Sequence, residues 1–220
     1  LRGHLGEAVL KLRRALEMAP EVALHHRVLG MAYRAVEDYD GSLRELRMAE
    51  SLQPKSAETQ YQLALTLEQI GERAAAETEG IAEGALEALK KATRLAPASP
   101  VYHYALGQRL VEQERYDEAK TSLEKAVELS PESAPWEAVL GDVYVLLGHD
   151  DQALEHFARA LESDPEEVTY LHRSALATHR LGMAREAVEL LEQATRLAPQ
   201  NAEVLSDLGD VYCDQEKHQE

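Results

Sequence analysis

The sequence predicts an all-α protein built from repeated pairs of helices. Two observations carry this prediction: prolines recur at a nearly fixed interval, and small and large apolar residues recur at fixed distances before each proline. A period of this length is the sequence signature of repeat proteins whose units stack on one another. The prolines are Pro20, Pro54, Pro97, Pro131, Pro165 and Pro199, spaced by 34, 43, 34, 34 and 34 residues.

Each proline is preceded by a segment that predicts the second helix of its unit. A small residue stands twelve positions before the proline, a large apolar residue eight before and an alanine five before, as in Ala119, Leu123 and Ala126. This spacing places all three side chains on one face of a helix. The small residues then allow a neighbouring helix to approach closely.

A Leu-Gly-x-x-Tyr pattern predicts the first helix of each unit, most clearly at Leu140, Gly141 and Tyr144. Glycine inside a helix costs about 1 kcal/mol relative to alanine, so its recurrence at one register predicts a close contact between two helix backbones. The glycines at this register are Gly30, Gly107, Gly141 and Gly209, and the other two first helices have Ala64 and Ala175 there.

Glycine and proline also predict where the helices end. Each repeat proline is expected to follow the end of a second helix, because proline lacks an N–H group and clashes with the preceding turn. The turns inside the units are expected at Gly3, Gly71, Gly148 and Gly182.

These residues resemble the tetratricopeptide repeat (TPR) family, whose units have a 34-residue period and a Trp/Leu-Gly/Tyr…Ala…Phe…Pro pattern. The resemblance covers essentially the whole chain and implies a right-handed superhelical solenoid with about five full repeats and a partial unit at each end. The unit at 168–201 departs most, with Ser174, Ala175 and Thr178 at the Leu-Gly…Tyr positions. Within a single array over 1–220, the expected pieces are the second helix of a truncated repeat at 1–22, full repeats at 23–56, 57–99 (with a nine-residue insertion), 100–133, 134–167 and 168–201, and the first helix of a truncated repeat at 202–220.

The nine extra residues lie within 72–84, and the sequence leaves their structure open. Their Ala and Glu content favours a longer helix, whereas Gly80 and Gly84 favour a break or a protruding loop. An insertion tolerated at an exposed turn is preferred over a protrusion that contacts a partner.

The charge pattern limits the classes of partner. The chain has 23 Lys and Arg against 40 Asp and Glu, a net charge of −17. Residues 1–110 carry 14 basic and 15 acidic side chains, while residues 111–220 carry 9 and 25. An acidic surface repels polyanions, so neither nucleic acid nor a membrane is expected as a partner.

No signal-type or membrane-spanning run is visible, which favours a cytoplasmic location. The start at Leu1 within the repeat pattern suggests a piece of a longer protein.

The sequence offers no catalytic or metal-binding motif. GxGxxG, GxxxxGK[ST], GxSxG and HExxH are absent, so we expect no enzyme activity, no cofactor and no metal. The single Cys213 excludes an internal disulfide and is interpreted as an exposed or interface thiol. His172 and His179 are seven residues apart and can share a helical face, where hydrogen bonding or pH sensitivity is preferred over metal binding.

The resemblance implies that the first helices line a concave groove that holds a peptide or a helix. The face opposite the Leu-Gly…Tyr residues is expected to point into this groove, and its central part is apolar enough to take an amphipathic helix or an extended apolar segment. The alternative is that these side chains contact neighbouring parts of the solenoid itself. The candidate groove residues are Arg27, Met31, Arg34, Tyr61, Leu65, Val101, Tyr104, Gln108, Val111, Asp142, Val145, His172, Leu176 and His179.

The preferred functional hypothesis is a non-catalytic protein–protein interaction scaffold that binds a partner's peptide or helix in this groove. A basic portion of that partner is expected toward the acidic C-terminal repeats. The alternative is a regulatory or sensor TPR arm of a larger multidomain protein whose catalytic domain lies outside this sequence. A third hypothesis is self-association through the apolar ends of the array.

Overall fold

The computed structural model describes residues 2–73 and 79–217, which form twelve α-helices and no strand. The contacts divide the chain into two compact units, Leu1–Leu106 and Gly107–Glu220. The helices are α1 (Arg2–Met18), α2 (Ala23–Ala35), α3 (Tyr39–Leu52), α4 (Ala57–Arg73), α5 (Glu79–Leu95), α6 (Pro100–Glu112), α7 (Tyr116–Leu129), α8 (Ala134–Leu146), α9 (Asp150–Ser163), α10 (Val168–Arg180), α11 (Ala184–Leu197) and α12 (Ala202–Lys217).

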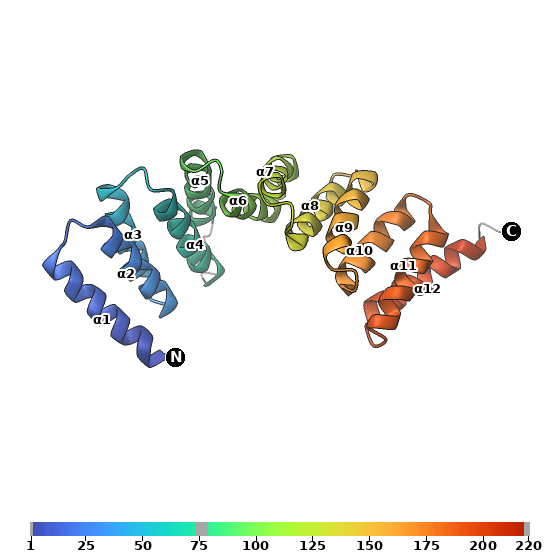
Figure 1. Ribbon diagram of the computed structural model, residues 1–220, viewed down its shortest axis with the longest axis horizontal. Helices are drawn as coiled ribbons and strands as arrows, with labels where there is room; N and C mark the ends of the chain where they lie inside the picture. The colour runs from blue at the N-terminus through green and yellow to red at the C-terminus, as the bar shows by residue number, and fades with distance from the viewer. Residues whose placement is uncertain (1, 74–78, 218–220) are drawn as a thin grey trace. The chain divides into compact units, whose positions relative to one another are not determined.

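Both units are built from helical hairpins (Figure 1). In the first unit α2 pairs with α3 and α4 with α5, while α1 packs on α2 and α3 packs on α4. In the second unit α8 pairs with α9 and α10 with α11, while α7 packs on α8, α9 on α10 and α11 on α12. In these units α2, α4, α8 and α10 therefore each lie between the second helix of the preceding hairpin and the second helix of their own hairpin.

The small–large–small faces of the second helices form the core. Phe157 and Leu123 are fully buried, together with the alanines at their register, as the spacing before each proline predicts. Burying a large apolar side chain contributes roughly 1.5–3 kcal/mol, so each helix pair is held mainly by this face.

The glycine register of the first helices is a site of close helix contact. A Cβ atom built on Gly141 would lie 2.6 Å from Cε1 of Phe157, and one built on Gly107 would lie 2.5 Å from Cγ of Leu123. Gly30 faces Leu46 in the same way, at 2.7 Å from its Cγ. Ordinary contacts between carbon atoms are about 3.5–4.0 Å, so only glycine fits the observed spacing without movement of the second helix.

The observed helix ends agree only in part with the turn positions predicted from the glycines. Gly148 and Gly182 adopt positive φ angles of 76° and 78° at the turns after α8 and α10, a conformation that favours glycine. Gly3 and Gly71 were expected at turns, but they lie inside α1 and α4. The prediction for these two is wrong because a glycine is tolerated inside a helix whose other residues favour helix and whose apolar face packs.

The insertion lengthens both helices of its hairpin. α4 and α5 have 17 residues each, against 13 in α2 and 14 in α3. Gly80 and Gly84 both lie within α5, so neither breaks the helix. Residues 74–78 lie outside the described residues.

Candidate functional site

The candidate groove residues all lie on first helices, in α2, α4, α6, α8 and α10. These residues fall into two groups, one in each compact unit. The first-unit face comprises Arg27, Met31, Arg34, Tyr61, Leu65, Val101 and Tyr104, and the second-unit face comprises Gln108, Val111, Asp142, Val145, His172, Leu176 and His179.

A hydrogen-bonded chain crosses three helices beside the first-unit face. Arg34 of α2 donates from Nη2 to Oε1 of Gln62 at 2.6 Å, and Gln62 donates from Nε2 to Oε1 of Glu58 at 2.7 Å. The other carboxylate oxygen of Glu58 accepts a 2.8 Å hydrogen bond from the hydroxyl of Tyr102 in α6. The ring of Tyr102 packs against Tyr61 with their centroids 5.0 Å apart. The chain therefore holds the hydroxyl of Tyr102 in place, and the ring of Tyr102 in turn packs against Tyr61.

Burial and the carboxylate keep these tyrosines neutral. Burial, the hydrogen bond to Glu58 and the charge of Glu58 together raise the pKa of Tyr102 to about 12. Burial also raises the pKa of Tyr61, and the charges of Glu68 and Glu58 act in the same direction. Tyr102 consequently remains a hydrogen-bond donor at neutral pH.

Apolar side chains lie around the tyrosine pair on the first-unit face. Met31 and Val101 are exposed, at 36% and 43% of their surface, whereas Tyr61 and Leu65 are half-buried. Arg27 donates to the hydroxyl of Ser56 at 3.2 Å, which ties α2 to the start of α4. This face therefore combines accessible apolar surface with aromatic side chains whose positions are fixed.

The polar residues of the second-unit face bind neighbouring helices. Arg173 of α10 donates to Oδ2 of Asp142 in α8 at 2.5 Å. On the other side of α10, Nε2 of His172 lies 2.5 Å from Oδ2 of Asp207 in α12. His179 pairs with Asp214 of α12 at 3.5 Å. These groups link helices within the unit, in line with the alternative that candidate residues contact the solenoid itself.

The spacing of these paired residues in the sequence indicates their pairing, although their residue types alone do not. Asp142 and Arg173 are 31 residues apart, and His172 and Asp207 are 35 apart, so each pair is separated by about one repeat length. Residues on successive first helices at equivalent positions lie side by side in a repeat protein. Opposite charges separated by one period are therefore candidates for pairing.

Asp142 is the acid whose titration this packing changes most clearly. Burial raises its pKa from 3.8 to about 6, although the charge of Arg173 and its hydrogen bond act in the opposite direction. Loss of hydration thus outweighs the ion pair at this position.

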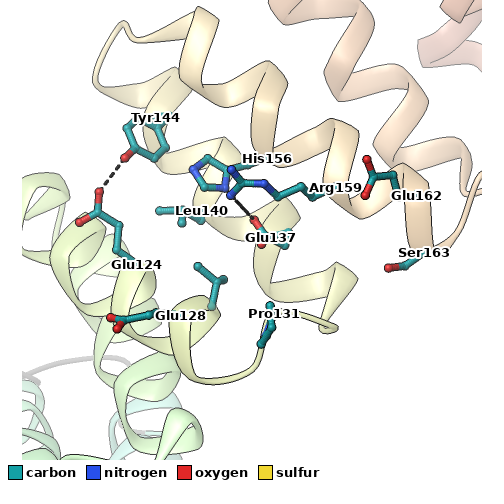
Figure 2. A pocket seen from close by; sticks show the side chains of 11 residues that line it. Glu124, Glu128, Pro131, Glu137, Leu140, Tyr144, His156, Arg159, Glu162 and Ser163 are labelled. Atoms are coloured by element: carbon teal, nitrogen blue, oxygen red, sulfur yellow. Dashed lines mark hydrogen bonds and ion pairs between the residues drawn. The ribbon is translucent and has the colours of Figure 1, made fainter.

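A cavity of about 670 Å³ opens between α7, α8 and α9 in the second unit (Figure 2). None of the residues that line it was proposed as a site from the sequence. Nδ1 of His156 lies 2.7 Å from Oε2 of Glu137, and the hydroxyl of Tyr144 donates to Glu124 at 2.6 Å. The lining residues are Glu124, Val127, Glu128, Pro131, Glu137, Leu140, Tyr144, His156, Arg159, Glu162 and Ser163.

The polar groups at the base of this cavity bond to one another. The ring of Tyr144 stacks on His156 with centroids 5.0 Å apart and an interplanar angle of 15°, and Arg159 lies 3.9 Å from the carboxylate of Glu137. Burial and the hydrogen bond to Glu124 raise the pKa of Tyr144 to about 12. These contacts connect the three helices that surround the cavity.

Among the residues that the structure describes, no three His, Cys, Asp or Glu side chains are placed to hold one metal ion. Cys213 is an exposed free thiol. Over residues 2–73 and 79–217, every helix is too short or too polar to cross a membrane.

The paired helices, the fully buried second-helix faces and the glycine contacts define a helical repeat protein. Profiles of the tetratricopeptide repeat family match residues 110–177 in one case and residues 2–57 and 174–220 in another, together well over half of the chain. The chain belongs to the tetratricopeptide repeat family, and its fold class is the all-α solenoid of that family. Proteins built from these repeats generally act as non-catalytic interaction scaffolds, and family membership supports this class of function here.

Solved structures of other proteins share the fold. YrrB, described as a TPR protein with an unusual peptide-binding site, has a TM-score of 0.77 and 21% identity over 89% of this chain and 96% of its own. A MamA protein has a TM-score of 0.72 and 25% identity over 82% of this chain and 94% of its own. PilF of Pseudomonas aeruginosa has a TM-score of 0.66 and 24% identity, covering 88% and 86%. A search of curated protein sequences gave no match.

Proposed function

We propose that this protein is a non-catalytic scaffold that binds a peptide or helix of a partner protein on its first-unit face. The observation that carries the proposal is the Tyr61–Tyr102 pair, in which a hydrogen bond to Glu58 holds Tyr102 and the ring of Tyr61 packs against it. Aromatic side chains held in place lose little conformational freedom on binding and often dominate the affinity of an interface.

The apolar residues beside the pair suit an amphipathic segment. Met31, Val101 and Leu24 are exposed on α2 and α6, and Leu65 is half-buried between them on α4. A partner helix or extended strand with apolar side chains on one face would remove this surface from water. The peptide-binding site for which YrrB is described supports peptide binding by a protein of this fold.

Charge supports an orientation for the partner. Residues 111–220 carry 25 acidic and 9 basic side chains, whereas residues 1–110 are nearly balanced. A partner whose basic portion lies toward the C-terminal repeats would be attracted by the second unit, and this attraction weakens as salt screens it.

The experiment uses the 220-residue protein as bait to select binding peptides from a display library of short random sequences. The selected peptides are expected to carry apolar residues at helical or alternating spacing. Tyr61→Ala and Leu65→Ala should each weaken their binding about tenfold, measured by fluorescence anisotropy, because both remove contact area at the centre of the face. Raising NaCl from about 50 to about 500 mM should weaken the binding of basic peptides.

The matched control is Tyr170→Ala. Tyr170 is a half-buried tyrosine that stands five residues after Pro165, as Tyr102 stands five after Pro97. It belongs to the second unit and is not one of the residues of the first-unit face, so peptide affinity should not change. Peptides that bind Tyr61→Ala and Leu65→Ala as tightly as the unsubstituted protein would place the binding surface elsewhere.

A further inference from the structure

The cavity between α7, α8 and α9 is lined by more acidic than basic side chains (Figure 2). Its basic groups are Arg159 and His156. Arg159 lies 3.9 Å from Glu137 and 3.9 Å from Glu155, and its side chain is 51% exposed, so it neutralises neither closely. The cavity therefore combines a volume of about 670 Å³ with unbalanced negative charge. Its acidic lining residues are Glu124, Glu128, Glu137 and Glu162.

Glu137 is a buried carboxylate that uses only one of its two oxygens. The residue is 3% exposed, and its Oε2 lies 2.7 Å from Nδ1 of His156. Among the residues that the structure describes, none donates a hydrogen bond to Oε1 of Glu137. A buried acceptor without a donor costs free energy, so a donor group that enters the cavity and reaches Oε1 would be bound favourably.

The first unit shows how a basic side chain is held at the corresponding place, between α3, α4 and α5. Nζ of Lys91 in α5 lies 3.4 Å from Oε1 of Glu50 in α3, and Nε2 of Gln60 in α4 donates to the same oxygen at 2.7 Å. A cation thus spans the two second helices and is balanced by an acid. The polar group of the first helix completes the contact.

The second unit lacks part of this arrangement. Relative to the repeat prolines, Arg159 stands at the position of Lys91, but Val127 stands at the position of Glu50. Arg159 therefore has no acid at this position of α7 with which to pair. The acid is instead Glu137 of the first helix, where α4 has an uncharged glutamine. The cavity consequently has an acceptor at its base and no side chain of its own that reaches it as Lys91 reaches Glu50.

We propose that this cavity binds an arginine side chain of a partner protein. The planar guanidinium has five N–H donors, so it can donate to Oε1 of Glu137 and to Glu124 of α7 at the same time. Glu124 forms no ion pair with any described residue, and a 2.6 Å hydrogen bond from the hydroxyl of Tyr144 holds its carboxylate in place. Charge-assisted hydrogen bonds of this kind are the strongest that a side chain offers.

The arginine site is distinct from the surfaces described above. Glu137 and Tyr144 lie on a different face of α8 from Asp142 and Val145, because successive residues of a helix are about 100° apart. None of the residues that line the cavity belongs to the first-unit face. The site therefore does not rest on the proposed binding of a peptide at Tyr61 and Tyr102.

An NMR titration of the 220-residue protein with the peptide acetyl-Gly-Arg-Gly-amide tests the proposal at low salt. Backbone amide signals of the residues that line the cavity should shift and saturate. The same peptide with citrulline has an uncharged group of nearly the same shape and should bind at least about tenfold more weakly. Equal binding of the citrulline peptide overturns the proposal. Equal binding of the corresponding lysine peptide overturns the assignment to arginine.

Two substitutions remove the proposed acceptors one at a time. Glu124→Gln and Glu137→Gln should each weaken binding of the arginine peptide about tenfold, because each replaces a charged acceptor by a neutral one. The fold accepts glutamine at the second position, since Gln60 stands at the same register in α4. Glu124 is exposed, so its substitution leaves the core unaltered. Unchanged affinity in both variants overturns the proposal.

The matched control is Glu189→Gln, which removes the same charge from an exposed position of α11 in the same unit. It should leave the affinity for the arginine peptide unchanged. A loss as large as that of Glu124→Gln would mean general attraction to an acidic surface and would overturn the proposal. Tyr61→Ala should also leave the affinity unchanged, so failure of the arginine site and failure of the peptide site are told apart.

Discussion

Nδ1 of His156 lies 2.7 Å from Oε2 of Glu137 and joins the two helices of the α8–α9 hairpin. In the α2–α3 hairpin the same two registers hold His26 and Glu45, again 2.7 Å apart, with the histidine and the glutamate exchanged. The repeat therefore accepts this buried pair in either order. In the α10–α11 hairpin the same registers hold Leu171 and Leu190, which belong to an apolar cluster.

This comparison predicts the effect of removing one or both partners. Glu137→Leu alone, or His156→Leu alone, should lower the free energy of unfolding by about 1–3 kcal/mol, because the remaining polar group is buried without its partner. The double variant should be close to the unsubstituted protein, since Leu–Leu already occupies these registers and apolar replacements of buried pairs are often neutral. Urea unfolding measures all three. A double variant as unstable as the sum of the single ones would contradict the prediction.

Asp142 predicts a pH dependence of stability. Its pKa is about 6 in the folded protein against 3.8 as the reference, so the folded state binds the proton more tightly. Between these two values the folded protein holds more protons than the unfolded chain, and the free energy of unfolding must fall as pH rises. Asp142→Asn should remove this fall. The measurement is urea unfolding at a series of pH values for both proteins.

The exposed Asp151 provides the control for the pH series. Asp151→Asn should leave the pH dependence of the original protein unaltered, because this side chain lies on the surface of α9. If the difference in unfolding free energy between the original protein and Asp142→Asn did not change between about pH 4 and about pH 6, burial would not control this carboxylate.

Substitution of glycine by alanine is predicted to have opposite effects on stability at Gly141 and Gly209. Gly141→Ala places a methyl group 2.6 Å from the buried ring of Phe157 and should lower the free energy of unfolding by about 1–3 kcal/mol. Gly209→Ala meets no described atom and should raise the stability by about 1 kcal/mol, because alanine favours helix over glycine. Both are measured by thermal and urea unfolding under identical conditions. Equal effects at the two positions would argue against the close contact at Gly141.

Replacement of Glu114 by glycine, in the turn after α6, is predicted to stabilise the protein. Glu114 has a φ of 58° at the turn after α6, seventeen residues before Pro131, where Gly148 has a φ of 76° before Pro165. A side chain in this left-handed conformation costs about 1 kcal/mol, so Glu114→Gly should raise the free energy of unfolding by a similar amount. Gly148→Ala should lower it. A Glu114→Gly protein no more stable than the original would show that Glu114 makes a compensating interaction.

The repeat, the two kinds of helix and the surfaces by which they meet follow from the sequence alone. This follows because close packing of two helices requires particular side-chain sizes at particular spacings, such as Phe157 against Gly141, and those requirements recur at intervals of 34 residues, with one interval of 43. The sequence did not determine the pairing of charged groups. Several acids and bases lie within reach of α10, and only the offset and rotation of the neighbouring helices bring Arg173 to Asp142 and His172 to Asp207. The tertiary structure also decided that Gly71 continues a helix and that a cavity opens beside Glu137, because both depend on how neighbouring helices pack and not on local propensity.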